Sequence, residues 1–339
     1  MSVDYKAKSR ELMKGFCRVC PICNGRACIG EVPGMGGLGS AASFHNNIEA
    51  LAKVTLNMTA LHSVTEPDTS TTFLGIPLKM PMLAAPIGGA QFNMSKGFSE
   101  DDYIEAVVAG CEAEGSLGCT GDGVPPFIID AAVKSLEKHK GIPFIKPWEG
   151  KELYEKLERV LACNPPAVGM DVDAAGLVTL RKMGRPVTPM STAKLAEVIA
   201  FVHEKKVPFI VKGIMTPSDA EKAVAAKADA IVVSNHGGRI LDHCPGTAAV
   251  LPAIAKQVRH RVAIAVDGGV RSGTDVLKML ALGADVVLIG RPFCLASVGG
   301  GLEGVKEYCQ TIKQQLTQAM LLTGVGRIED ITSAIIYGA

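Results

Sequence analysis

The sequence predicts an α/β protein built as a (β/α)8 TIM barrel with an irregular Cys- and Gly-rich N-terminal arm. From about residue 80 onward, short apolar or β-branched runs alternate with longer helical patterns. Eight such units favour a closed parallel barrel over an open doubly wound sheet. No G-x-G-x-x-G motif stands at a first strand–helix turn to support that alternative. The 339 residues, 47% of them hydrophobic, suffice for one barrel plus an extension.

The strands are predicted from apolar runs that turn residues bound. They cover residues 82–85, 116–119, 143–146, 167–171, 208–212, 230–234, 262–267 and 286–290. Helices are predicted between them, for example at 151–161, 191–205, 217–227 and 273–282. Pro217 and Asp219 suit the first turn of a helix, where proline and acidic residues are favoured. Gly283 suits a helix end, because glycine readily takes the left-handed conformation found there.

The remaining organisation is simple. Residues 1–45 form the predicted arm, and residues 46–339 form the barrel domain, with 46–80 leading into the first strand. The net charge of +1 gives no reason to expect a nucleic-acid or membrane-surface partner. No apolar run approaches the roughly 20 residues of a membrane span, and residues 1–16 lack the apolar segment of a signal peptide. We therefore expect a cytoplasmic protein.

In a barrel of this kind the chemistry lies at the carboxyl ends of the strands. Lys212 ends the fifth strand, where a cation stabilises an anionic cofactor or intermediate, unless it only pairs with a neighbouring carboxylate. The sixth strand runs into Ser234-Asn235-His236-Gly237-Gly238-Arg239. His236 is placed as a general base, and Arg239 offers a guanidinium for a carboxylate. Together they describe a site that fixes an acid and removes a proton beside it.

The ends of the last two strands are predicted to bind a phosphate. Asp267-Gly268-Gly269-Val270-Arg271 follows the seventh strand, and Gly290-Arg291-Pro292 follows the eighth. Glycine amides, helix N-termini and arginines suit an anion, and barrels often bind phosphate at this place. Two tight turns with surface arginines are the structural alternative.

Taken together, these motifs resemble the FMN-dependent 2-hydroxy acid oxidase/dehydrogenase family, to which glycolate oxidase and lactate oxidase belong. The resemblance is carried by Ile210-Val211-Lys212-Gly213, the 234–239 run, the 267–271 run and Ile289-Gly290-Arg291-Pro292. It covers most of residues 46–337. The resemblance implies an FMN-dependent oxidation of a small-molecule 2-hydroxy acid to a 2-oxo acid, carried out by a homotetramer.

The resemblance also implies a role for each matching residue. His236 would take a proton from the substrate, Arg239 would bind the substrate carboxylate, and Lys212 would stabilise the anionic reduced flavin. The FMN-binding residues that it implies are Ala85, Pro86, Ile87, Gly88, Lys146, Asp171, Lys212, Ser234, Asp267, Gly268, Gly269, Arg271, Gly290 and Arg291.

Several positions depart from the family pattern. Lys146 and Asp171 stand where the family usually has Gln and Thr. The family's N-terminal active-site Tyr has no counterpart, because Tyr5 lies too far upstream, and Trp148 stands where a second Tyr follows the third strand. The loop after the fourth strand is shortened to residues 176–189. A short loop leaves room for a larger substrate or a partner protein.

The arm carries Cys17, Cys20 and Cys23 in a C-x2-C-x2-C run, and Cys28 follows after four more residues. This spacing resembles ferredoxin-type runs without being identical to them. Four thiolates equally suit tetrahedral zinc, and unliganded or redox-labile thiols are the remaining alternative. An iron–sulfur centre would give FMN an electron outlet other than O2, to an electron-acceptor protein. Residues 34–39 follow as a flexible Gly-rich stretch, and the arm is expected to cover or line the active site.

Two other functions stay open. One is a related FMN barrel on a different substrate, either oxidising a peptide-derived or amine substrate or acting as an isopentenyl-diphosphate-type isomerase. The other is a non-enzymatic electron-transfer module, which only the cysteines support. The pair of His236 and Arg239 favours the hydroxy acid, because a diphosphate gives no role to a carboxylate-binding arginine beside a base.

Overall fold

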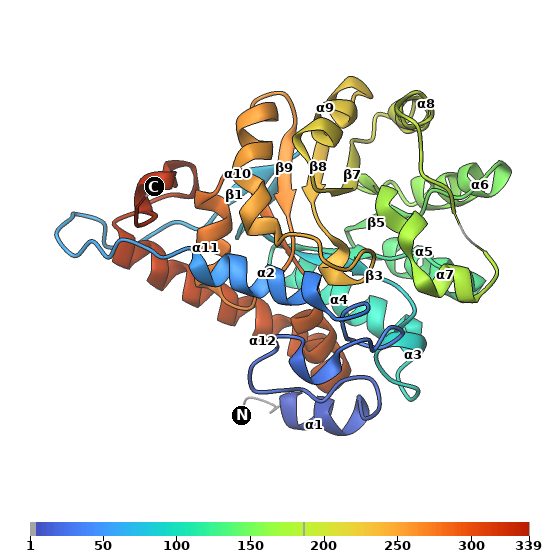
Figure 1. Ribbon diagram of the computed structural model, residues 1–339, viewed down its shortest axis with the longest axis horizontal. Helices are drawn as coiled ribbons and strands as arrows, with labels where there is room; N and C mark the ends of the chain where they lie inside the picture. Colours follow the sequence, from blue (N-terminus) through green and yellow to red (C-terminus); the bar gives the residue numbers. More distant parts are fainter. Residues whose placement is uncertain (1–4, 186, 339) are drawn as a thin grey trace.

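A computed structural model describes residues 5–185 and 187–338 of the protein. The first four residues of the predicted arm, Pro186 in the shortened loop and Ala339 lie outside the described residues. At its centre is a closed barrel of parallel strands (Figure 1). The strands are β3 (Met82–Ile87), β4 (Leu117–Thr120), β5 (Gly141–Ile145), β6 (Val168–Asp171), β7 (Phe209–Ile214), β8 (Ala230–Val233), β9 (Ala263–Val266) and β10 (Val286–Ile289). The barrel closes where β10 pairs with β3, with Val287 opposite Met82. The predicted TIM barrel is confirmed, and each predicted strand overlaps an observed one.

Helices surround the barrel, and several of them start at a side chain that accepts a hydrogen bond from a first-turn amide. The main ones are α4 (Glu100–Ala113), α5 (Pro126–Leu136), α6 (Lys151–Leu161), α8 (Thr192–His203), α9 (Pro217–Ala225), α10 (Thr247–Val258), α11 (Gly273–Ala281) and α12 (Arg291–Thr323). At the start of α9 the Thr216 hydroxyl accepts from the Asp219 amide. At the start of α11, Ser272 and Asp275 cap each other's backbone in a capping box.

The barrel interior is a packed apolar core. Alternate side chains of the strands point inward, among them Leu83, Phe144, Ile210 and Leu288. The strands carry apolar residues on both faces because the helices bury the outer face as well. A small antiparallel hairpin, β1 (Thr71–Phe73) with β2 (Ile76–Leu78), adds Phe73 and Leu78 to the interior cluster. This hairpin was not among the predicted elements.

The N-terminal arm is more ordered than predicted. It begins with α1 (Tyr5–Leu12), which lies beside α12, where the Ser9 hydroxyl donates to the Leu295 carbonyl oxygen at 2.6 Å (Figure 1). Helix α2 (Ala42–Lys53) crosses the predicted domain boundary at residue 45. The stretch 34–39, predicted to be flexible, contains buried Met35 and is tied to the barrel by hydrogen bonds. No helix in the described ranges is both long and apolar enough to cross a bilayer.

Candidate active site

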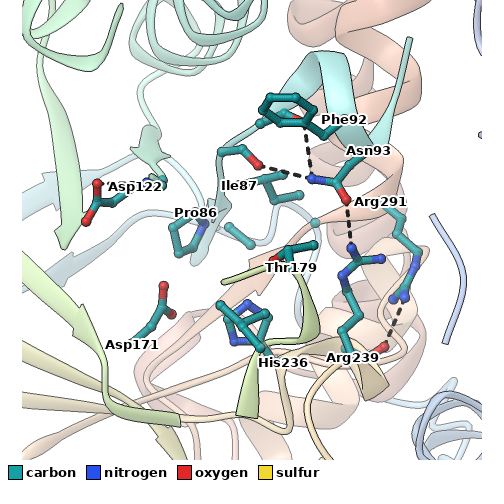
Figure 2. Close-up of a pocket in the computed structure, with 18 of the residues that line it drawn as sticks. Pro86, Ile87, Phe92, Asn93, Asp122, Asp171, Thr179, His236, Arg239 and Arg291 are labelled. Carbon is teal, nitrogen blue, oxygen red and sulfur yellow. Dashed lines mark hydrogen bonds between the residues drawn. The ribbon is translucent and has the colours of Figure 1, made fainter. Parts of the chain in front are cut away.

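A pocket opens at the carboxyl ends of the barrel strands, and the predicted site residues meet there (Figure 2). Its lining includes Ala85, Pro86, Ile87, Gly88, Lys146, Asp171, Lys212, His236, Arg239, Asp267, Gly268, Gly269, Arg271, Gly290 and Arg291. Ser234 is the one residue predicted to bind FMN that lies outside this lining. It is buried behind it, with its hydroxyl donating to Asp267 Oδ2 at 2.8 Å. Pro33 and Met35 of the arm also line the pocket, which confirms that the arm contributes to the site.

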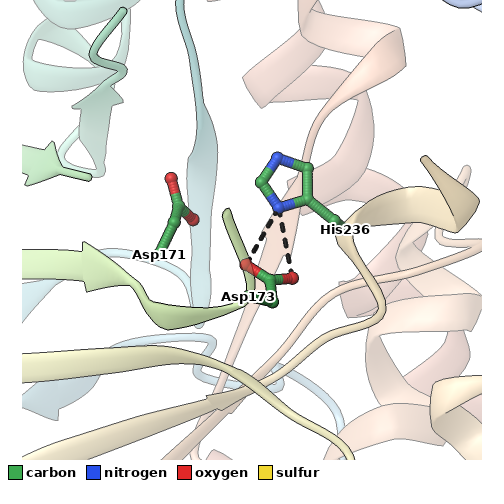
Figure 3. A group of neighbouring side chains, drawn as sticks. All are labelled: Asp171, Asp173 and His236. Atoms are coloured by element: carbon green, nitrogen blue, oxygen red, sulfur yellow. Dashed lines mark hydrogen bonds and ion pairs between the residues drawn. The ribbon is translucent and has the colours of Figure 1, made fainter. Parts of the chain in front are cut away.

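The histidine of the site is held by a carboxylate. His236 Nδ1 lies 3.2 Å from both carboxylate oxygens of Asp173, which follows β6 (Figure 3). Asp173 was not assigned this role from the sequence. A carboxylate on Nδ1 keeps the proton there in the neutral imidazole, so Nε2 is the nitrogen that can accept a proton. The arrangement is that of an oriented general base.

Beside the histidine lies a network of buried charges. Lys212 Nζ is 2.9 Å from Asp171 Oδ1 and 3.9 Å from Asp267 Oδ2, and Lys146 Nζ is 3.8 Å from Asp171 Oδ2. Burial alone would raise the pKa of Asp171, but the positive charges of Lys212, His236 and Lys146 outweigh it and hold that pKa well below its usual range.

The same interactions act on the lysine. Burial alone would lower the pKa of Lys212, but the carboxylates of Asp171, Asp173 and Asp267 raise it above its ordinary value. Lys212 is therefore a fixed cation in the pocket. Asp171, Asp173 and His236 are the one group of three or more candidate metal ligands within 4.8 Å of one another in the described residues. Because the Lys212 ammonium already contacts Asp171, we interpret this group as a charge network and not as a metal centre.

Two half-buried arginines connect the pocket to the arm. Arg239 Nη1 donates to the carbonyl oxygens of Gly34 and Gly36 at 2.5 and 3.2 Å. Its Nη2 donates to Asn93 Oδ1 at 2.9 Å, as Figure 2 shows. These bonds use three of the five guanidinium donors, which leaves Nε–H and one Nη2–H for a ligand. Burial and the neighbouring charge of Arg291 lower the pKa of Arg239 to about 10.

Arg291 is held in the same way. It donates from Nε to the Met35 carbonyl oxygen at 2.8 Å and from Nη2 to those of Gly36 and Gly237, each at 3.0 Å. Its guanidinium carbon lies 3.8 Å from the centre of the Phe44 ring. Neither Arg239 nor Arg291 forms an ion pair with a carboxylate in the described part of the chain.

The turn after β9 lets a ligand come close to the backbone. Gly268 and Gly269 have φ values of 103° and 84°, which side chains rarely allow. A Cβ at Gly268 would lie 2.6 Å from the Thr247 hydroxyl oxygen. Asp267 Oδ1 and Arg271 Nε are buried without a hydrogen-bond partner. Because buried polar atoms are normally paired, these two atoms mark places where a bound ligand would supply partners.

Comparison with known proteins identifies the family. The model of the FMN-dependent dehydrogenase family matches residues 34–185 and 181–338. The chain belongs to this family. A 2-hydroxyacid oxidase of Dictyostelium discoideum is 53% identical over 132 residues, which span 39% of this chain and 34% of that protein. An L-lactate oxidase of Lacticaseibacillus rhamnosus is 32% identical across 85% of this chain and 84% of its own length. A crystal structure of a mandelate oxidase variant superposes with a TM-score of 0.77 at 25% identity, covering 96% of both chains.

The pocket fits the FMN of the FMN-dependent dehydrogenases. The Gly268–Gly269 turn, the N-terminus of α12 and the unpaired Arg271 Nε would hold the phosphate. The unpaired Asp267 Oδ1 would accept a hydrogen bond from a hydroxyl group of the ribityl chain. The predicted family, the barrel and the FMN cofactor are thus confirmed.

The residue at the position of the family's second Tyr does not line the pocket. Trp148 stays out of the pocket lining, and its Nε1–H donates to the buried carboxylate of Asp122 at 2.6 Å. Asn93 was missed by the sequence analysis, although it joins Arg239 to the turn after β3 by donating to the Gly89 carbonyl oxygen at 3.1 Å. No local signal marks this asparagine, because its partners come from distant parts of the chain.

Proposed function

We propose that this protein oxidises a 2-hydroxy acid to the corresponding 2-oxo acid in the pocket at the carboxyl ends of the barrel strands. The observation that carries the proposal is the base His236, oriented by Asp173, in one pocket with the cations Lys212 and Arg239. The relatives named 2-hydroxyacid oxidase, lactate oxidase and mandelate oxidase support the same reaction class.

Each side chain has a defined task in this proposal. His236 Nε2 accepts the proton that leaves the substrate, and Asp173 stabilises the imidazolium that results. The two remaining donors of Arg239 hold the substrate carboxylate. FMN, when bound, supplies the two-electron acceptor. Lys212, a buried cation, offsets the negative charge that gathers on the reduced cofactor.

The alternatives are less well supported. A diphosphate isomerase would need several cations around the substrate, whereas the arginines of this pocket donate mainly to backbone carbonyl oxygens of the arm. Oxidation of a peptide or an amine would give the guanidinium of Arg239 no carboxylate to bind next to the base. A module without catalysis would give His236 and Asp173 no task.

The test is anaerobic mixing of the flavin-loaded protein with a panel of 2-hydroxy acids, followed by flavin absorbance. We expect one acid class to bleach the flavin, and His236→Gln to slow that bleaching about 10²-fold or more with the flavin content unchanged. His203→Gln is the matched control, because His203 also pairs with an aspartate, Asp229, at 2.7 Å but lies on the outer helix α8. Bleaching of His236→Gln at the wild-type rate would refute the proposal.

Four finer expectations stay predictions. They are a cytoplasmic location, a homotetramer, a separate electron-acceptor protein, and a metal centre on the four cysteines of the arm.

A further inference from the structure

We propose that Cys17, Cys20, Cys23 and Cys28 ligate a [4Fe–4S] cluster, which carries electrons away from the active site one at a time. The surroundings of the four cysteines in the arm indicate where the cluster lies. Its role as an electron outlet rests on the proposed function, because the oxidised hydroxy acid is the source of the electrons.

The four cysteines differ from most others in the chain by their surroundings. Cys111, Cys119, Cys294 and Cys309 are buried, as expected for small apolar side chains in a core. The arm cysteines are all partly exposed and share one segment, residues 13–41, whose regular structure is a single 3-10 turn at Arg26–Cys28. The segment has backbone hydrogen bonds of its own, such as the one from the Gly30 amide to the Gly37 carbonyl oxygen at 3.0 Å. A metal centre on several thiolates would add a cross-link to them.

Two of the sulfurs already receive hydrogen bonds. The Val19 amide donates to Cys17 Sγ at 3.3 Å, and Arg271 Nη2 donates to Cys23 Sγ at 3.5 Å. Val19 has a φ of 46°, which is rare for a β-branched residue. Hydrogen bonds to ligand sulfurs stabilise their negative charge and tune the potential of a cluster.

The charge around the arm fits an anionic centre. Arg239 and Arg291 lie beneath the arm, half-buried and without a carboxylate partner in the described residues, and Arg271 contacts Cys23. Glu31, the acidic residue of the segment, already forms a bidentate ion pair with the guanidinium of Arg18. The FMN phosphate offsets part of this positive charge. A cluster held by four thiolates, with net negative charge, would offset more of it.

The sulfurs of the arm are not as close together as a tetrahedral zinc site requires. Tetrahedral zinc with Zn–S bonds of about 2.3 Å requires sulfurs about 3.8 Å apart. In the described ranges no three cysteine sulfurs lie within 4.8 Å of one another. A [4Fe–4S] cluster needs wider spacing, because each thiolate binds a different iron of the cube. The C-x2-C-x2-C run of Cys17, Cys20 and Cys23 has the spacing of ferredoxin-type ligand runs, and Cys28 is the candidate for the fourth ligand.

The place of the cluster makes it an electron outlet. Arg271 lines the FMN pocket and contacts Cys23, so one side chain spans the distance from the pocket to the arm. Oxidation of one 2-hydroxy acid releases two electrons and two protons. A [4Fe–4S] centre takes one electron at a time, so two molecules of a one-electron carrier protein are reduced in each turnover, and both protons pass to solvent, one of them by way of His236.

The experiment is elemental analysis of the full-length protein purified without oxygen, with electron paramagnetic resonance after reduction by dithionite. We expect about four iron atoms and four acid-labile sulfides per chain, and a signal of a reduced cluster. Cys20→Ser and Cys23→Ser should each lose the iron, the sulfide and the signal. Cys163→Ser is the matched control, because Cys163 is also partly exposed but lies outside the arm, and it should retain all three.

Three results would overturn the proposal. They are one zinc per chain without sulfide, no iron or sulfide even after reconstitution with ferrous iron and sulfide, and iron that persists in both arm variants. The wild-type analysis decides on its own if an arm variant fails to fold. Iron and sulfide in a protein whose flavin no 2-hydroxy acid bleaches would contradict the proposed function alone, and a bleachable flavin without iron would contradict the cluster alone.

Discussion

The substitution Asp171→Thr tests whether the pocket depends on its buried charge network. Asp171 is the carboxylate that Lys212 and Lys146 share, and the side chains of Asp171 and Lys212 are each 3% exposed. Removing the carboxylate leaves two buried ammonium groups with only the longer contact from Lys212 to Asp267, at 3.9 Å. We therefore expect a large loss of stability from one substitution that changes little volume.

The magnitude follows from the distances. Two unit charges at the 2.9 Å of the Lys212–Asp171 pair attract by about 6 kcal/mol at an effective dielectric constant of about 20. Part of this attraction only offsets the desolvation of both groups. Removing one partner of a buried pair is nevertheless expected to cost about 3–5 kcal/mol, because the other charge stays buried. That is a large share of the roughly 5–15 kcal/mol by which a folded domain is stable.

The pH dependence of this loss has a definite sign. Because the pKa of Asp171 is lowered in the folded protein, its contribution is present above about pH 4 and is lost as the pH falls through the folded pKa. Because the pKa of Lys212 is raised, its contribution is present below about pH 10 and is lost as the pH rises through the folded pKa. The stability that the pair contributes to the wild type should therefore be flat between about pH 5 and 9.

The assay is urea unfolding of the flavin-free protein, followed by circular dichroism. Asp171→Thr should lower the free energy of unfolding by about 3–5 kcal/mol. Adding Lys146→Gln, which restores the pair of residues usual in the family, should recover at least about 1 kcal/mol because the two sites are coupled. The control Asp219→Asn removes an exposed ion pair to Lys222 and should change stability by less than about 1 kcal/mol. A loss below about 1 kcal/mol in Asp171→Thr, or strict additivity with Lys146→Gln, would refute the reasoning.

Three further predictions concern the site. Asp173→Asn should lower kcat/KM for the hydroxy acid about 10²-fold at unchanged flavin content, because His236 loses the partner that fixes its proton; an unchanged pH–rate profile would argue against it. Gly268→Ala should weaken FMN binding and lower the free energy of unfolding by about 1–3 kcal/mol. The reason is that the new Cβ would lie 2.6 Å from the Thr247 hydroxyl oxygen, at a φ of 103°. Calorimetry on the wild type and the variant measures both effects. The pocket wall around Phe92 is apolar, so kcat/KM should rise about fourfold for each methylene added to the substrate side chain, and a flat series from glycolate upward would contradict this.

The barrel could be predicted from the sequence because its signals are local and repeated. Each strand is a short apolar run that ends in turn residues, and eight such runs leave little choice of architecture. The β1–β2 hairpin escaped because Thr71–Phe73 and Ile76–Leu78 are three residues each, too short for an alternating pattern to stand out. Helix α1 escaped because the Cys and Gly composition of the arm obscured the helical stretch at its start.

The site could be predicted where its residues follow one another, as in the run from Ser234 to Arg239 after β8. It could not be predicted where a contact joins distant segments. Asp173 and His236 are 63 positions apart, and Arg239 and Gly34 are 205 positions apart. A strand-end motif shows which side chains face the pocket, but the partners that orient them depend on the closed barrel and on the path of the arm.

The path of the arm limits how Arg239 can bind a ligand. In Arg239 three of the five donors are fixed by the arm carbonyls and Asn93, so the guanidinium reaches a ligand only from its remaining edge and in one orientation. Pro33 and Met35 form the pocket wall next to it, on the same segment that carries the four cysteines. Any change that loosens the cysteine loop therefore also loosens the arginine. Substrate affinity and the state of the thiols should for this reason vary together, although no cysteine lines the pocket.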